Sequence, residues 1–166
     1  MKLDDVEAIL RALNDAHARY LLVGGLAVVA HGYVRYTADV DIVLQLEREN
    51  VLRAMAALDI IGYRPLVPVT GSDFADEGLR ENWIKEKNMI VFQMVNPNRQ
   101  STRLDIFVAE PFGFPEQYAA ARWEDVAGVR VPVVQYSELL RLKRAAGRPR
   151  DLIDIEQLEL ISKPDE

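Results

Sequence analysis

The pattern that decides the fold is Asp39-Val40-Asp41-Ile42-Val43-Leu44, which follows Gly24-Gly25 after thirteen intervening residues. Val40, Ile42 and Leu44 fall on one face of an extended chain, and the two acids fall on the other, because successive side chains of a strand point to opposite faces. The segment is therefore predicted to be a strand with one apolar face and one acidic face. Two carboxylates this close repel each other, and a cation relieves that repulsion.

The residues just before this strand predict a backbone suited to anions. Tyr20–Val23 is a short apolar run that ends at Gly24-Gly25, which indicates a buried strand and a sharp turn. Leu26–His31 then has the pattern of a short helix ended by Gly32. Glycines let the backbone approach phosphate oxygens, and the N–H groups at a helix start favour negative charge. Taken alone, the glycine pair also fits a tight packing turn.

A third acid lies inside a later apolar strand pattern. Asp105 stands between Leu104 and Ile106 in the predicted strand 103–109. An acid at such a position is costly to bury unless it is paired or binds a metal ion. If this strand lies beside strand 39–44, the three carboxylates can hold two magnesium ions. The alternatives are a solvated Asp-x-Asp face and an ion pair between Asp105 and Arg103.

The remaining pattern predicts an α+β fold. The predicted helices cover about 3–18, 51–61 with Asn50 as N-cap, 74–87 closed by Asn88, 117–122, 138–145 capped by Ser137, and 151–161 after the break at Gly147-Arg148-Pro149. The predicted strands include a hairpin of 89–95 with 103–109 and a short strand 129–134, whereas the prolines of 63–69 indicate an edge strand or extended loop. We expect a small mixed β-sheet with helices packed mainly on one face, C-terminal helices, and a single domain over residues 1–166.

Composition limits the classes of function. The chain has 166 residues, 49% of them apolar, and no cysteine, which excludes disulfides, thiolate zinc sites and cysteine nucleophiles. Residues 1–10 are acidic and helical in pattern, unlike a signal peptide, and no apolar run approaches the roughly 20 residues that span a bilayer. We therefore expect a soluble, cytoplasmic protein without membrane contact. The net charge of −6 disfavours broad nucleic-acid binding and suits a cationic small acceptor or a protein partner.

The motifs resemble those of a known superfamily. Val23-Gly24-Gly25 followed by Arg35-x-Thr37-x-Asp39-x-Asp41 is similar to the signature of the DNA polymerase β-like nucleotidyltransferases, and Asp105 in Leu104-Asp105-Ile106-Phe107 matches their third carboxylate. The segment 139–152 resembles the ending of small bacterial and archaeal members related to abortive-infection and toxin-type nucleotidyltransferases. The resemblance covers about residues 20–158.

This resemblance implies a reaction and its ligands. An acceptor hydroxyl would attack the α-phosphate of an NTP such as ATP, and pyrophosphate would leave. Asp39, Asp41 and Asp105 would be the catalytic, metal-binding residues for Mg²⁺, with two ions expected and Mn²⁺ as a substitute. Gly24 and Gly25 would cradle the triphosphate. Many members carry Gly-Ser at this point, so here the backbone N–H groups would act without a serine hydroxyl.

Four further residues are candidate nucleotide contacts: Arg35, Thr37, Lys143 and Arg148. Arg35 and Thr37 flank the acids, Lys143 follows an apolar helical stripe and could reach a phosphate as a point charge, and Arg148 lies on a turn. The alternatives are a surface arginine, a β-branched strand residue and a solvated lysine. Asp151 is predicted to cap the last helix.

The acceptor stays open at this stage. It could be tRNA, a protein or a small cationic molecule. The alternative function is a toxin–antitoxin-type protein-binding module with weak or no catalysis, which would act through a partner protein. A phosphohydrolase that uses the same acids is disfavoured, because the chain has two histidines and no His-Asp metal pattern.

Overall fold

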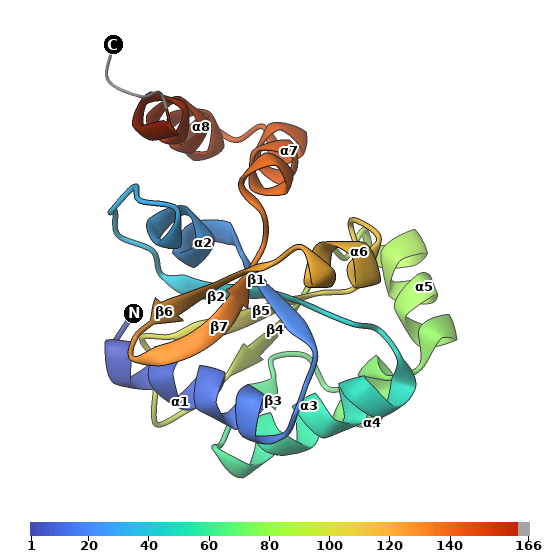
Figure 1. The fold of residues 1–166 in the computed structure, drawn as a ribbon. Helices are drawn as coiled ribbons and strands as arrows, with labels where there is room; N and C mark the ends of the chain where they lie inside the picture. Colours follow the sequence, from blue (N-terminus) through green and yellow to red (C-terminus); the bar gives the residue numbers. More distant parts are fainter. Residues whose placement is uncertain (163–166) are drawn as a thin grey trace.

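A seven-stranded mixed sheet forms the centre of the computed structural model, which describes residues 1–162 (Figure 1). The strand order is β3-β4-β5-β2-β1-β7-β6. The strands are β1 (Tyr20–Val23), β2 (Asp39–Leu44), β3 (Arg64–Pro65), β4 (Val91–Val95), β5 (Arg103–Phe107), β6 (Arg122–Val126) and β7 (Val129–Val133). The helices are α1 (Leu3–Asp15), α2 (Gly24–Ala30), α3 (Arg48–Ile60), α4 (Gly71–Phe74), α5 (Glu77–Lys87), α6 (Phe114–Ala119), α7 (Tyr136–Ala146) and α8 (Pro149–Ser162). The α+β class with a mixed sheet and C-terminal helices is confirmed.

Strand directions place β2 and β5 side by side. β2 runs antiparallel to β1 and parallel to β5, and β5 runs antiparallel to β4. The predicted hairpin of β4 with β5 is therefore present, and so is the strand pairing that would bring Asp105 to the acidic strand. On the other side of β1, β7 pairs with it in parallel and forms a hairpin with β6.

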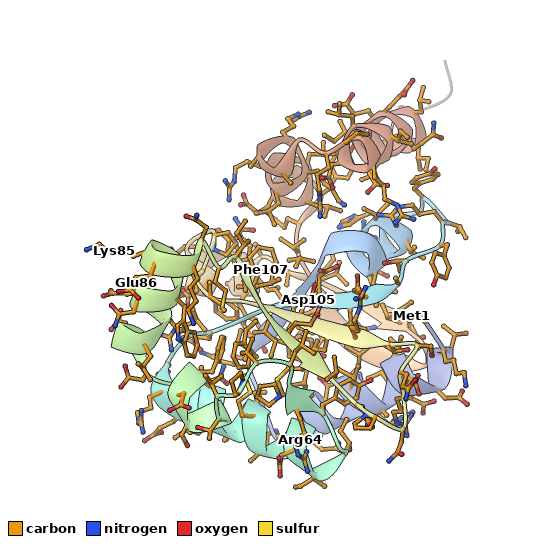
Figure 2. All side chains as sticks on the ribbon, turned by 180° about the vertical axis from the view of Figure 1, so that it is seen from behind. Met1, Arg64, Lys85, Glu86, Asp105 and Phe107 are labelled. Atoms are coloured by element: carbon orange, nitrogen blue, oxygen red, sulfur yellow. The ribbon has the colours of Figure 1, made fainter. Side chains whose placement is uncertain are left out.

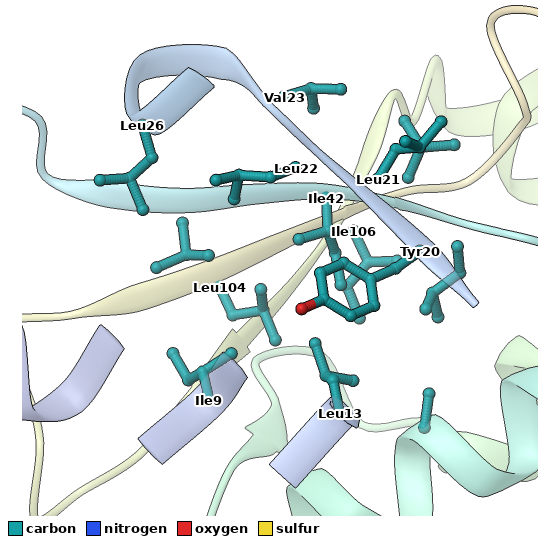
Figure 3. Packing of buried hydrophobic residues seen from close by; sticks show 14 of the residues in the cluster. Ile9, Leu13, Tyr20, Leu21, Leu22, Val23, Leu26, Ile42, Leu104 and Ile106 are labelled. Atoms are coloured by element: carbon teal, nitrogen blue, oxygen red, sulfur yellow. The ribbon is translucent and has the colours of Figure 1, made fainter. Parts of the chain in front are cut away.

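One face of the sheet is closed by α1 and α3 (Figure 1). Ile9 and Leu13 of α1 are fully buried, because their helical spacing puts them on one stripe. Figure 3 shows this stripe packed toward Tyr20, Leu104 and Ile106 of the sheet. Each such side chain contributes about 1.5–3 kcal/mol of apolar burial. This packing therefore holds strands β1, β2 and β5 in place through the face of the sheet that α1 covers.

The opposite face is only partly covered. Helices α7 and α8 lie together above α2, at some remove from α1 and α3 (Figure 1). The alternating burial of β2 and β5 leaves Asp39, Asp41, Asp105 and Phe107 on this less covered face, while Ile42 and its neighbours face the core. The fold thus holds the acidic positions on a rigid sheet under the C-terminal helices.

Two predicted helices differ from the observed ones. The prediction of one helix over 74–87 is wrong, because Asp76 accepts a hydrogen bond from the Leu79 N–H and starts a new helix, α5, after the short α4. The helix predicted at 117–122 begins earlier, at Phe114, with proline in its first turn. Residues 122–126 instead form β6.

Two predicted N-caps are also wrong. Glu47 occupies the N-cap of α3, and the buried Asn50 side chain instead accepts from Arg19 N–H and donates to the carbonyls of Arg19 and Gln45. The N-cap of α7 is Gln135 rather than Ser137. Within residues 1–162, no helix combines the length and the apolar character needed to cross a membrane. The predicted single domain 1–166 includes residues 163–166, which lie outside the described residues.

Candidate active site

Three aspartates lie on the same face of two adjoining parallel strands. The register pairs Asp41 with Asp105 and Asp39 with Arg103. Asp105 and Phe107 lie on the side of the sheet that faces α7 and α8 (Figure 2). Sequence spacing brings Asp39 beside Asp41, and the strand pairing adds Asp105. The three acids therefore form one ledge, which we call the acidic ledge.

The acids of this ledge disturb one another. Burial raises the pKa of Asp41, the charges of Asp105 and Asp39 raise it further, and the result is about 6, although the Gly25 N–H donates a hydrogen bond to its carboxylate. Burial also raises the pKa of Asp105, and Asp39 adds to the rise. Gln93 Nε2 donates to Asp105 Oδ1 at 2.9 Å and partly offsets this. The ledge carries negative charge that the protein balances only in part.

A neighbouring arginine supplies part of that balance. Arg103 Nε donates to Asp39 Oδ1 at 2.9 Å, so the arginine pairs with Asp39 rather than with Asp105. This hydrogen bond raises the pKa of Arg103. The pair is solvent-exposed, with 50% of the arginine side chain and 29% of the aspartate side chain accessible.

The glycine pair makes room for the ledge. Gly24 has a φ of +64°, and a Cβ on it would lie 2.1 Å from Asp41 Oδ2. A Cβ on Gly25 would lie 2.3 Å from Thr37 Oγ1. Helix α2 begins at Gly24 itself, earlier than the helix start predicted at Leu26. The sequence needs glycine here because the acidic strand and the loop before it approach the backbone closely.

The predicted cations Lys143 and Arg148 belong to an ion network with Arg35. Lys143 Nζ lies 2.9 Å from Asp151 Oδ1 and 2.8 Å from Asp154 Oδ2. Arg35 donates to both oxygens of Asp154, at 2.6 and 2.7 Å, and Arg148 Nε donates to Asp151 at 2.7 Å. We call these five residues the Lys143 network. Asp151 is the third residue of α8 rather than its predicted N-cap, and its side chain accepts from the Arg148 N–H at 3.2 Å.

The aspartate pKa values in the Lys143 network shift in the opposite direction to those of Asp41 and Asp105 in the ledge. Burial raises the pKa of Asp151 and Asp154, but hydrogen bonds and charges outweigh it and the net shift is downward: Arg148 and Lys143 lower Asp151, and Arg35 and Lys143 lower Asp154. Three cations face two carboxylates, which leaves one net positive charge. The network also ties α7 and α8 to the loop that precedes β2.

A cavity of about 280 Å³ lies between the ledge and the network. Its lining includes Gly24, Asp41 and Asp105 from the sheet side and Lys143, Arg148 and Arg150 from the helix side. Arg35, Thr37 and Gly25 also line it. All the sequence-predicted site residues therefore meet around one cavity. Their roles in nucleotide binding stay predictions, because Lys143 and Arg35 already hold carboxylates.

The ledge has the oxygen donors that a divalent cation prefers, but its three carboxylates do not converge on one point. Across residues 1–162, no three His, Cys, Asp or Glu side chains converge in a metal-holding arrangement. Asp39 instead binds Arg103, and Asp105 binds Gln93. Three carboxylates with unbalanced charge are the oxygen donors that Mg²⁺ prefers. The residues present therefore fit the expected metal.

Several site residues carry weak sequence signals. Gln93 lies opposite Asp105 across the β4–β5 hairpin, so a register for the predicted hairpin would have found it. Arg103 lies two residues before Asp105, on the same face. Asp154 gives no local signal, because its partner Arg35 is 119 residues away in sequence.

Solved structures that share this architecture include proteins named as an adenylyltransferase and as a putative nucleotidyltransferase. The chain is similar to the lincosamide antibiotic adenylyltransferase LnuA in its lincomycin-bound form, with 18% identity, a TM-score of 0.64, and coverage of 96% of this chain and 97% of that one. It is similar to ANT(2″)-Ia in complex with adenylyl-2″-tobramycin, with 16% identity, a TM-score of 0.62, and coverage of 96% and 88%. A putative nucleotidyltransferase from Thermotoga maritima is similar at 12% identity, a TM-score of 0.58, and coverage of 93% and 90%.

These likenesses define the fold. The chain has the nucleotidyltransferase fold, consistent with the DNA polymerase β-like architecture expected from its motifs. No protein-family model and no curated protein matches the sequence.

Proposed function

We propose that this protein is a magnesium-dependent nucleotidyltransferase that moves a nucleoside monophosphate from an NTP to an acceptor hydroxyl. The observation that carries the proposal is the register of β2 with β5, which sets Asp105 directly opposite Asp41 beside Asp39. Three carboxylates on rigid strands give the positioning and charge control on which phosphoryl transfer depends. The fold shared with known nucleotidyltransferases supports the same conclusion.

In the proposed reaction, the acidic ledge on the sheet side and the cations on the helix side have different roles. The acceptor oxygen forms a bond to the α-phosphorus, the bond from that phosphorus to the β-phosphate bridging oxygen breaks, and pyrophosphate leaves. Mg²⁺ held by Asp39, Asp41 and Asp105 would supply charge neutralisation and activation of the hydroxyl. Asp105 takes the acceptor proton in this scheme, because it lines the cavity on the strand directly beside Asp41.

In the proposed complex the triphosphate lies between the backbone N–H groups of Gly24 and Gly25 and the cations on the helix side of the cavity. Arg148 and Arg150 line the cavity from α8 and its preceding turn, and the Lys143 network, to which Arg148 belongs, carries one net positive charge. Arg148 has 74% of its side chain exposed, so it can turn toward a phosphate. ATP is the proposed donor, because LnuA is named an adenylyltransferase and ANT(2″)-Ia is in complex with an adenylyl-tobramycin.

The proposed acceptor is a small cationic molecule with a hydroxyl group. LnuA binds lincomycin, and ANT(2″)-Ia holds an adenylyl-tobramycin. The net charge of −6 favours such an acceptor over tRNA. The protein-binding alternative of the toxin–antitoxin type stays a prediction, as do a protein acceptor and a cytoplasmic location.

A labelled-nucleotide assay tests the proposal. The protein is incubated with Mg²⁺ and each α-labelled NTP, with a panel of hydroxyl-bearing aminoglycosides and lincosamides in one series and total tRNA in another. We expect one labelled small-molecule product and an equal amount of pyrophosphate, which depends on Mg²⁺. Asp105→Asn should remove both signals.

The control variant is Asp59→Asn. Asp59 forms an exposed ion pair with Arg64 on the surface, outside the cavity lining, and its loss changes the net charge by the same amount. It should keep full activity. Absence of any labelled product and of ATP binding in the presence of Mg²⁺ would refute the nucleotidyltransferase proposal.

A further inference from the structure

The three carboxylates of the ledge have three different hydrogen-bond donors. Asp41 accepts from the backbone N–H of Gly25, and Asp105 accepts from the neutral amide of Gln93. Asp39 accepts from a charged guanidinium, that of Arg103. A backbone donor is fixed, whereas an arginine side chain can leave. The ledge therefore has one ligand position that is held by a movable cation.

We propose that Arg103 is an internal counter-ion that holds Asp39 in the metal-free protein and is exchanged for the divalent cation when the active site assembles. This inference rests on the proposed function, since it concerns the same metal-binding carboxylates. It assigns a positioning role to a residue that neither the motif nor the fold identifies.

The strand register puts Arg103 where a counter-ion is needed. Arg103 is the direct cross-strand partner of Asp39 and lies two residues from Asp105 on the same face of β5. Its Nε makes the 2.9 Å contact with Asp39. Without a cation, three carboxylates on two adjacent strands would repel one another. One guanidinium at this position removes part of that repulsion while no metal is bound.

The exposure of the pair makes the exchange feasible. Half of the Arg103 side chain is accessible, so the guanidinium can rotate into solvent without leaving a buried charge or a cavity. Exposed ion pairs are weak, and a divalent cation that several carboxylates share binds each of them more strongly than one arginine does. Lys143 is a useful contrast, because it is buried between Asp151 and Asp154 and cannot leave without uncovering them.

The exchange also accounts for the state of the ledge. Within residues 1–162, no set of three acidic or histidine side chains is assembled for a metal ion, although the backbone already aligns Asp41 with Asp105. In the proposed exchange, Asp39 joins these two carboxylates when Arg103 releases it. On this view the cation completes the site by taking the place of Arg103.

Metal binding to the free protein tests the exchange without any reaction. Mn²⁺ is titrated by calorimetry and by electron paramagnetic resonance into the nucleotide-free wild type and into Arg103→Met, which keeps the aliphatic length but has no charge or donor. We expect Mn²⁺ to bind about tenfold more tightly to R103M, the scale at which residues around metal ligands change affinity. Arg103→Lys, which retains a charged donor, should return the affinity to within about twofold of wild type.

The matched control separates ligand release from a general charge effect. Arg150→Met also removes one positive charge from the cavity lining, but the Arg150 hydrogen bond is to the Tyr36 carbonyl and not to a ledge carboxylate. It should change the affinity by no more than about twofold. The gain in R103M should vanish when Asp39→Asn is added, because no ligand is then released.

The outcomes distinguish this inference from the proposed function. Equal Mn²⁺ affinity in wild type and R103M, or an equal gain in R103M and R150M, overturns the exchange and leaves the nucleotidyltransferase proposal intact. Failure of every variant to bind Mn²⁺, with and without ATP, overturns both. Tighter binding in R103M alone, restored by R103K and removed by Asp39→Asn, supports the exchange.

Discussion

The acidic ledge and the Lys143 network face each other across one cavity, and both are built from aspartates. In the ledge, the pKa of Asp41 rises to about 6 because burial and two other carboxylates disfavour its charge. In the network, the pKa values of Asp151 and Asp154 fall although burial alone would raise them. The difference comes from partners, since lysine and two arginines meet the network acids.

The two regions therefore differ in whether their carboxylates have cationic partners. Carboxylates without enough cationic partners repel one another, and a bound cation relieves that repulsion. Groups with pKa values perturbed in this way are frequent at functional sites. Carboxylates that are paired on every side contribute order instead. Asp154 joins α8 to the loop at Arg35 and to α7 at Lys143, so the network fixes the helices above the ledge.

The largest expected effect follows from removing a charge from the ledge. Asp41→Asn should lower nucleotidyl transfer by about 10³-fold, the scale for losing an electrostatic element of a transition-state site. The same variant should raise the free energy of unfolding at pH 7, because it removes a repelled carboxylate. Initial rates and urea denaturation measure the two effects. A variant that is both inactive and destabilised would contradict the assignment of strain to the ledge.

Removing a charge from the network should have the opposite effect on stability. Asp154→Asn leaves Arg35 and Lys143 without a shared carboxylate, and breaking a buried ion pair costs about 3–5 kcal/mol. Denaturation with urea gives this loss directly. The control lies on the same helix: Glu159→Gln breaks the exposed pair with Arg144 and should cost under about 1 kcal/mol. Similar losses in the two variants would remove the distinction.

The two regions should also respond oppositely to pH. Asp41 keeps its proton in the folded state up to a pKa of about 6 and loses it near 3.8 when unfolded, so its contribution lowers stability as pH rises from about 4 to 6. The network acids have lowered pKa values, so they stabilise above about pH 4 and lose that contribution as pH falls through their folded pKa values.

Denaturation as a function of pH checks these signs. The stability advantage of Asp41→Asn over wild type should be near zero below about pH 4, grow to about 2–3 kcal/mol by about pH 6.5, and stay level above it. Asp154→Asn should show its deficit at neutral pH, and the deficit should shrink in acid. A pH-independent difference for Asp41→Asn would mean that its carboxylate is not perturbed.

The sequence predicts the acidic ledge but not the Lys143 network. The ledge was predictable because period-2 alternation places Asp39 beside Asp41, and the apolar setting of Asp105 marks it as unusual. The network was not, since Arg35 and Asp154 lie at opposite ends of the chain and only packing brings them together. Lys143 was identified as a phosphate candidate, but sequence could not show that two aspartates bind it.

The same reasoning applies to the fold. Strong apolar periodicity predicted α1, β1, β2 and the β4–β5 hairpin, whereas β6 was missed because this edge strand is largely exposed and has no alternating apolar face. The break between α4 and α5 was missed because a single capping aspartate, Asp76, outweighed a continuous helical composition. Predictability therefore follows burial, since buried elements carry periodic signals and exposed edges do not.

The smallest expected effect concerns the residue that connects the two regions. Arg148 donates a hydrogen bond to Asp151, which makes it part of the Lys143 network. It also lines the cavity, and 74% of its side chain is exposed. Arg148→Met should cost under about 1 kcal/mol of stability, as exposed pairs do. It should raise KM for ATP about 3- to 10-fold with little change in kcat, because a typical net hydrogen bond of about 0.5–1.5 kcal/mol corresponds to a factor of that size.

The comparison variant is Arg144→Met, on α7, which breaks an exposed ion pair outside the cavity lining. It should match Arg148→Met in stability but leave KM for ATP unchanged. If both variants shift KM equally, Arg148 acts only through the overall charge of the helices. If Arg148→Met instead destabilises the fold as Asp154→Asn does, Arg148 is structural, and Arg150 is left as the proposed phosphate contact on the helix side.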